Sequence, residues 1–432
     1  MLDGWLSVIG SWLSALGRRR GGFFPQPGLL VALLFALAIT TNIAVAQESR
    51  APGASIDVAL LTFGPGTEVW ERFGHNAILI RDRASGVENL YNYGIFDFDQ
   101  EDFFLNFARG RMTYRMAVDN LADDLPMYRA EGRWIVEQDL NLTPPQRARL
   151  AAFLDWNARP ENTQYRYEYF TANCSTRVRD TLDAALDGAI KAQTIASSRG
   201  FTYRMDTLRL MRPELALMLA MDAGLGPFAD RRLSYWDESF VPMELMRQLR
   251  EVGVRDESGN LRPLVALETH LADARIPDPP DFPPAWIWQA LASGILSALA
   301  LLGLARLRAR VWARAIFATI ANVCALVLGL GGVVLIALWA FTEHISAWRN
   351  ENLLLLDPLC LFLLPTWIGA FRARWQPSIF AQRLGFAIAL LAGLAFFIKV
   401  FPAFPQDNRF WIALLLPLHI SFALSLVQAR KH

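Results

Sequence analysis

Residues 171–180, with the sequence TANCSTRVRD, decide how the first half of this chain is interpreted. They predict the start of a helix, because Val178 and Leu182 keep helical spacing and Gly188 would end the segment. Cys174 then falls in the first helical turn. A helix N-terminus carries partial positive charge and unpaired N–H groups, so this position would lower the thiol pKa and bind a developing oxyanion. The segment therefore suggests a thiol nucleophile.

A thiol nucleophile needs a base, and the region before the apolar half of the chain contains two histidines, His75 and His270. His75 stands in a Gly-His-Asn sequence within a strand-like run, whereas His270 lies close to a proline-rich linker. We therefore predict Cys174 as the nucleophile and His75 as its base, with Asn92 or Tyr91 on the following strand as the residue that orients the imidazole. The alternative is a small buried thiol and a histidine that is merely hydrogen-bonded.

The segments around these residues alternate between short strands and short helices, which predicts an α+β domain. A turn at Ser85 and Gly86 would join two of the strands as a hairpin. Thr143 followed by two prolines is typical of a helix N-terminus. The predicted strands are 56–63, 73–80, 89–96 and 132–140, and the predicted helices are 100–110, 120–130 and the segment beginning at 143.

Composition narrows the class of protein. Hydrophobic residues make up 53% of the 432 and charged residues 19%, against roughly 25% charged in an average soluble protein. This excludes a disordered chain and argues against a wholly soluble one. The net charge of +1 gives no basis for a nucleic-acid partner. Three cysteines are too few for a disulfide framework, and one cysteine with two separated histidines gives no metal-ligand spacing. We expect neither a metal nor another cofactor.

The chain divides into four parts. Residues 1–46 have the pattern of a signal peptide, with an uncleaved N-terminal anchor as the alternative. Residues 47–190 form the predicted thiol domain, and residues 191–284 a helical extension that ends in the proline-rich linker. Residues 285–428 form an all-α membrane bundle of about five helices, because each apolar run approaches or exceeds the ~20 residues that cross a bilayer. The runs are 286–305, 315–341, 354–371, 384–404 and 410–427.

Arginine is distributed unevenly between the loops of this bundle. The loops at 306–314 and 372–383 are arginine-rich, whereas those at 342–353 and 405–409 hold one Arg each. The positive-inside rule therefore places the arginine-rich loops in the cytoplasm and the thiol domain outside. Together with the export signal, this predicts a multi-pass protein of the bacterial inner membrane whose catalytic domain lies in the periplasm.

Four short motifs resemble a known family. The chain is similar to the Lnb-type lipoprotein N-acyltransferases, and its first half resembles the permuted papain-like (NlpC-type) fold, in which the histidine strand precedes the Asn-Cys helix. The motifs are Phe73-Gly74-His75, residues 91–98 (YNYGIFDF), residues 173–176 (NCST), and Glu343-His344 followed by residues 350–355 (NENLLL) in an outer loop.

The resemblance implies a thiol acyltransferase at the outer face of the membrane. Cys174 would take an acyl chain from a membrane phospholipid as a thioester and pass it to the N-terminal amine of a lipoprotein. It also implies substrate-binding roles, which we assign to Asn173, Tyr91, His344, Asn350 and Asn352. The outer-loop residues could instead be a solvated loop with helix caps. The alternative functions are a Cys-His peptidase or amidase that acts on peptidoglycan and a non-catalytic envelope scaffold.

Overall fold

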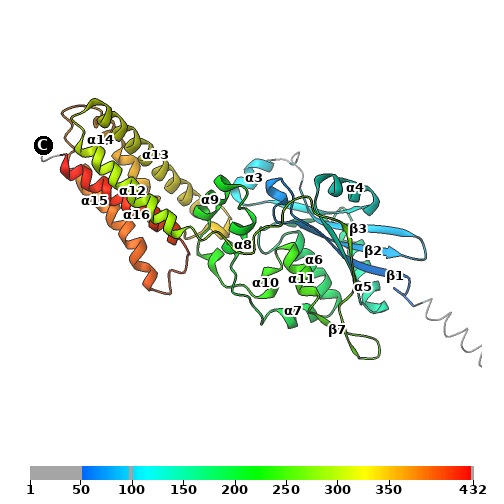
Figure 1. Ribbon diagram of the computed structural model, residues 1–432. Helices are drawn as coiled ribbons and strands as arrows, with labels where there is room; N and C mark the ends of the chain where they lie inside the picture. The colour runs from blue at the N-terminus through cyan, green and yellow to red at the C-terminus, as the bar shows by residue number, and fades with distance from the viewer. Residues whose placement is uncertain (1–50, 97–99, 101, 430–432) are drawn as a thin grey trace, which may run out of the picture. The chain divides into compact units, whose positions relative to one another are not determined.

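The computed structural model describes residues 51–96, 100 and 102–429. The predicted signal peptide or anchor at 1–46 lies outside these residues. The described chain has an α+β part, which is built on an antiparallel sheet, followed by a bundle of long apolar helices (Figure 1). The predicted fold class, a sheet-containing domain before an all-α membrane region, is confirmed at this level.

A seven-stranded sheet carries the site. Its strand order is β6-β4-β3-β2-β1-β5-β9, and every neighbouring pair is antiparallel. The four predicted strands are present, while β4, β6 and β9 come from stretches for which no strand was predicted. The strands are β1 (Ile56–Phe63), β2 (His75–Asp82), β3 (Val87–Ile95), β4 (Thr113–Asp119), β5 (Ile135–Leu140), β6 (Gln164–Arg166) and β9 (Val265–Ala272).

Side chains along each strand point alternately to the two faces of the sheet, and both faces are buried. Leu60 and Ile78 pack with the helices α5, α6 and α11 on one face, while Leu61 and Leu79 pack with α4 on the other. The helices of this domain are α3 (Phe103–Arg109), α4 (Leu121–Glu131), α5 (Pro144–Asn157), α6 (Cys174–Ala185), α7 (Ala189–Thr194), α8 (Tyr203–Leu210), α9 (Leu215–Gly224), α10 (Tyr235–Glu238) and α11 (Pro242–Leu249).

Residues 191–284 differ from the predicted helical extension. Helices α7 to α11 fill their first half, but a small hairpin of β7 (Gly253–Arg255) and β8 (Leu261–Pro263) follows, and β9 then returns to the main sheet. Pairing with β9 covers the outer edge of β5, which would otherwise expose unpaired backbone groups. His270 lies in this ladder opposite Val136. The segment therefore completes the sheet and is not a separate helical subdomain.

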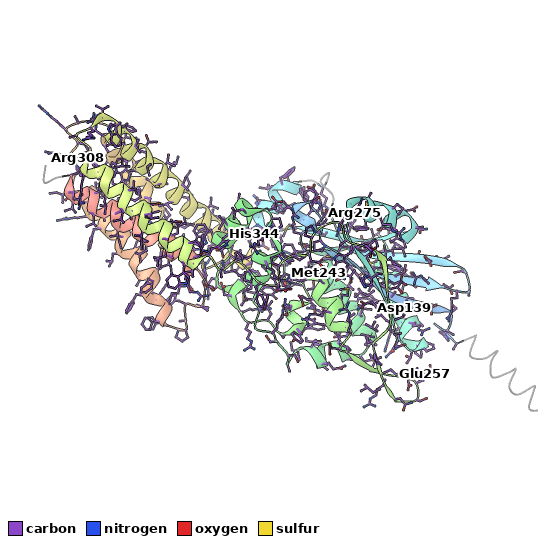
Figure 2. The ribbon with its side chains drawn as sticks, in the orientation of Figure 1. Asp139, Met243, Glu257, Arg275, Arg308 and His344 are labelled. Atoms are coloured by element: carbon purple, nitrogen blue, oxygen red, sulfur yellow. The ribbon has the colours of Figure 1, made fainter. Side chains whose placement is uncertain are left out.

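Four helices of the second half are long and apolar enough to cross a membrane: α12 (Ile287–Arg306), α13 (Val311–Phe341), α15 (Ile379–Phe397, continuing to Val400) and α16 (Arg409–Gln428). The span predicted at 354–371 is broken. The helical segments Ile345–Leu354 and Pro358–Gly369 meet at 44° and count as a fifth span only if taken together. Asp357 caps a new short helix that begins at Pro358, and this interrupts the span. Figure 2 labels Arg308 and His344 near the two opposite ends of the bundle.

Candidate active site

The N-terminus of α6 positions the thiol. Asn173 is the N-cap, and its side chain accepts a hydrogen bond from the backbone N–H of Thr176 at 2.9 Å while the Thr176 hydroxyl binds the backbone N–H of Asn173. This capping box fixes where the helix starts, so that Cys174 occupies its first position. The predicted placement of Cys174 in the first helical turn is confirmed.

The sulfur is more strongly desolvated than the sequence suggested. Burial is the largest influence on Cys174 and raises the pKa of its thiol to about 11. The backbone N–H groups of Asn76, Ser175 and Cys174 itself favour the thiolate, as does the charge of Arg133, but their sum is smaller than the cost of desolvation. The expected lowering of the thiol pKa at a helix N-terminus is therefore wrong for this resting structure. Cys174 is a neutral thiol surrounded by groups that would stabilise its anion.

Gly94, at the end of β3, allows the close approach of the helix to the sheet. Its φ is +90°, and a Cβ built on it would lie 3.1 Å from the Cβ of Cys174. A larger residue would be strained here and would press on the nucleophile. The close packing of α6 against the end of β3 thus explains the glycine in the motif at residues 91–98.

A chain of hydrogen bonds orients the imidazole of His75. Its Nε2 lies 3.0 Å from Oδ1 of Asn92, and Nδ2 of Asn92 donates to Asp119 at 2.8 Å. A carboxylate only accepts hydrogen bonds, so the Asn92 amide must turn its NH2 group to Asp119 and its oxygen to His75. Nε2 of His75 then carries the hydrogen, and Nδ1 keeps the free lone pair. The prediction that Asn92 lies beside the imidazole is confirmed, while its catalytic role stays a prediction.

His75 is neutral in this environment. Burial is the main cause that lowers its pKa to about 4, and the charge of Arg133 acts in the same direction, against the hydrogen bond that the ring donates to Asn92. Arg133 is itself buried and donates to the carbonyl of Gly64 at 2.7 Å, which holds its charge close to both the thiol and the imidazole. A neutral imidazole with a free Nδ1 can accept a proton from a thiol.

The thiol lies close to the start of β2, the central strand that begins with His75. The backbone N–H of Asn76, the residue after His75, interacts with the sulfur, and Asn76 Oδ1 lies 2.8 Å from the Ser175 hydroxyl. Across the residues that the structure describes, no hydrogen bond joins the ring of His75 to Cys174. Catalytic hydrogen bonds in unliganded enzymes are often open and close only with substrate.

These protonation states predict how the thiol reacts with iodoacetamide. Because the thiol pKa is about 11, the thiolate fraction of Cys174 should rise about tenfold per pH unit between pH 7 and 10. We expect the alkylation rate of Cys174 to follow this rise without a plateau, as measured by peptide mass spectrometry on the full-length protein. A rate that is already constant at neutral pH would indicate a thiolate–imidazolium pair and contradict the neutral resting state.

Two of the other predicted residues make contacts that stabilise the fold. Tyr91 lies on the face of β3 opposite to Asn92, is 2% exposed and donates its hydroxyl to Asp155 at 2.6 Å. The side-chain amide of Asn173 donates to two backbone carbonyls besides capping α6. The structure therefore gives Tyr91 a core position and Asn173 a capping role, and the substrate-binding role predicted for them stays untested.

The outer loop after α13 contacts the sheet domain. His344 Nε2 lies 3.0 Å from the carbonyl of Phe107 in α3, and its ring stacks on Tyr169. Asn350 and Asn352 are buried, and both donate to the carbonyl of Ala223 at 2.9 Å, at the C-terminal end of α9. The two asparagines thereby cap a helix whose last carbonyls have no partners within it. Their predicted role in substrate binding stays a prediction. In the structure, their hydrogen bonds hold the outer loop against the sheet domain.

Sequence reasoning missed Asp119 and Arg133. Asp119 ends β4, and the alternating apolar positions Met116 and Val118 are the signal that could have revealed that strand. The position of Arg133 beside the site depends on long-range packing against Gly64, and the local sequence carries no signal of it. Among the residues described, no cluster of three or more His, Cys, Asp or Glu could hold a metal ion.

The fold and the site define a membrane-bound protein with an exported domain that carries a Cys-His pair. Family models identify it further: the Lnb N-terminal periplasmic domain matches residues 46–213, and the Lnb transmembrane domain matches residues 293–432. The chain belongs to the Lnb family and is an inner-membrane protein with a periplasmic domain, as predicted. Comparison with curated proteins and with solved structures found no match.

Proposed function

We propose that this protein is a thiol acyltransferase that moves an acyl chain from a lipid ester to the N-terminal amine of a lipoprotein. The observation that carries the proposal is the arrangement of Cys174 at the start of α6 beside the ordered row of His75, Asn92 and Asp119. Membership of the Lnb family supports a lipoprotein-processing role. The membrane bundle supports lipid substrates, because a tethered enzyme meets bilayer-bound molecules at high effective concentration.

The first half-reaction makes the acyl-enzyme. His75 Nδ1 takes the proton of the Cys174 thiol, and the sulfur attacks the carbonyl carbon of the ester. The first-turn N–H groups of α6 are the donors available to the oxyanion of the tetrahedral intermediate. The bond to the alcohol oxygen then breaks, and His75 returns the proton to that oxygen. The products are a thioester on Cys174 and a free lipid alcohol.

The second half-reaction uses the same groups. The uncharged amine of the acceptor attacks the thioester carbon, the C–S bond breaks, and an amide forms. His75 accepts the proton released by the nitrogen and passes it to the leaving sulfur, which restores the resting pair. Arg133, through its charge near the sulfur, stabilises each thiolate that appears in this sequence.

The experiment is acyl transfer by the full-length protein in phospholipid nanodiscs, with a synthetic diacylglyceryl-cysteine peptide as acceptor. We expect an amide-linked acyl chain that resists mild alkali. A gain of one acyl mass would identify the phospholipid as donor, whereas an unchanged mass with one ester lost would identify the lipopeptide's own ester. Cys324→Ala, which alters a half-buried thiol in α13, is the matched control and should retain activity. Release of peptides from peptidoglycan without acyl transfer would contradict the proposal and favour the hydrolase.

A further inference from the structure

Helix α3 exposes three adjoining large apolar side chains, which we call the apolar row: Phe104, Leu105 and Phe107. Phe104 is 74% exposed, Leu105 44% and Phe107 43%. Exposed apolar residues that adjoin one another on a charged domain are typical of a contact surface. The structure indicates what this surface contacts, because α3 is hydrogen-bonded to the end of a membrane span.

The bonds to that span fix the position of α3. The backbone N–H of Glu343 donates to the carbonyl of Arg109 at 2.8 Å, and His344 contacts the carbonyl of Phe107. Gly110, with φ of +73°, makes this approach possible, because a Cβ there would lie 2.8 Å from the backbone nitrogen of His344. The last turn of α3 is therefore joined to the residues that directly follow α13.

The end of α13 marks the outer surface of the bilayer. Trp339 is 47% exposed and Phe341 79%, and exposed aromatic side chains at the end of a span are typical of the lipid headgroup level. A helix of seven residues is about 10 Å long, and the headgroup layer on each side is several ångströms deep. Glu343 follows Phe341 by two residues and donates its N–H to the carbonyl of Arg109, so α3 is within a few residues' reach of the headgroup level.

The charged side chains next to α3 are also suited to contact with phospholipid headgroups. Arg111 and Arg166 are each more than half exposed, and both pair with the single carboxylate of Glu343. Arg109 at the end of α3 is also exposed. At the C-terminal end of α3, three arginines against one glutamate leave a positive rim next to the apolar row, while the exposed Asp102 lies at the other end of the helix. Basic residues beside exposed apolar ones are typical of helices that lie in a phospholipid interface.

An aromatic row leads from α3 toward the thiol. Phe103 of α3 packs against Phe96 at a ring distance of 6.4 Å, Phe96 against Tyr114 at 5.5 Å, and Tyr114 against Tyr167 at 4.1 Å. Phe96 lies two residues after Gly94, which contacts Cys174. Burial and then the negative charge that Cys174 carries when ionised raise the pKa of Tyr167, which lies near the sulfur.

We propose that α3 lies within the outer-leaflet interface of the bilayer that holds this chain's own spans, and that the aromatic row guides an acyl chain from there to Cys174. The second half of this inference rests on the proposed acyl transfer, whereas the location of α3 does not. The chemical class of ligand is the acyl portion of a phospholipid or lipoprotein. The row of Phe and Tyr rings offers it an apolar surface outside the hydrocarbon core.

The location is tested with a nitroxide label on Leu105→Cys in the full-length protein in phospholipid vesicles. The native cysteines are replaced in this background by Cys174→Ser, Cys324→Ala and Cys360→Ala. Phe153→Cys on α5 is the matched control, because Phe153 is 42% exposed and Leu105 44%. We expect the Leu105 label to collide readily with lipid-soluble oxygen and to be shielded from a water-soluble nickel complex, and the Phe153 label to show the opposite. Equal access of nickel to both labels would overturn the location.

The guiding role is tested with Leu105→Asp, which places a charge in the apolar row. We expect it to slow acyl-adduct formation from vesicle phospholipid about tenfold or more and to leave alkylation of Cys174 by water-soluble iodoacetamide unchanged. Phe153→Asp should change neither rate. Adduct formation at the wild-type rate in Leu105→Asp would overturn the guiding role. If the wild type forms no adduct at all, the proposed function fails, and the nitroxide measurement still decides where α3 lies.

Discussion

Cys174→Ser should abolish formation of the acyl-enzyme, lowering its rate at least about a thousandfold, and leave the protein folded. The hydroxyl is a much poorer nucleophile than the thiol at this site. It is close in size, and the N–H groups of Asn76 and Ser175 that face the sulfur can donate to an oxygen instead. The measurement is intact mass after incubation in phospholipid, where only the wild type should carry a fatty-acyl adduct that hydroxylamine removes.

Cys360→Ala provides the control for this experiment. Cys360 lies in the core of the membrane bundle, away from the sheet domain, so its replacement should leave the adduct in place. An adduct on the Cys174→Ser variant would mean that another group is acylated. Absence of any adduct on the wild type would favour the scaffold function.

His75→Gln should lower the rate of acyl-enzyme formation by about 10² to 10⁴, because it removes the base while glutamine can still bond to Asn92. The reaction needs the neutral ring, and burial lowers the pKa of His75 to about 4. The wild-type rate should therefore persist as the pH falls from 7 to 5 and decline as it approaches 4, well below the ordinary value near 6.5. The His75→Gln variant should lack this acid limb.

His270→Gln is the matched control, since His270 is the other histidine of the periplasmic domain and is exposed on β9. It should keep both the wild-type rate and the acid limb. An acid limb near pH 6.5 in the wild type would contradict the desolvated position of His75. An unchanged rate in His75→Gln would remove His75 from the mechanism.

Local signals in the sequence predicted the elements that carry the site. The Asn-Cys helix start is set by capping chemistry within four residues, and the Gly-His strand by alternation, so both were recognisable without tertiary information. The thiol pKa was predicted in the wrong direction because a helix terminus is a local feature, whereas desolvation depends on what the sheet and its loops place around Cys174. The papain-like character of the domain stays a prediction.

The features of the site that the sequence did not predict depend on long-range contacts. Asp119 bonds to Asn92 on a neighbouring strand, and Asn350 contacts α9 more than a hundred residues away in the chain. The span predicted at 354–371 contains Asp357 and Pro358, and these residues start a new short helix inside it, which a prediction from apolar length alone does not capture. Neither the bond between Asn92 and Asp119 nor the contact of Asn350 with α9 has a signature in the nearby sequence.

The return of β9 to the sheet has a consequence for how the protein is made. Gln138 of β5 and Glu268 of β9 are hydrogen-bonded although 130 residues separate them, and β9 ends shortly before α12, the first membrane helix among the described residues. During export the outer edge of β5 therefore stays unpaired until almost the whole periplasmic domain has crossed the membrane. Completion of the periplasmic domain then coincides with insertion of α12, so that the fold is assembled only where the bilayer is already within reach.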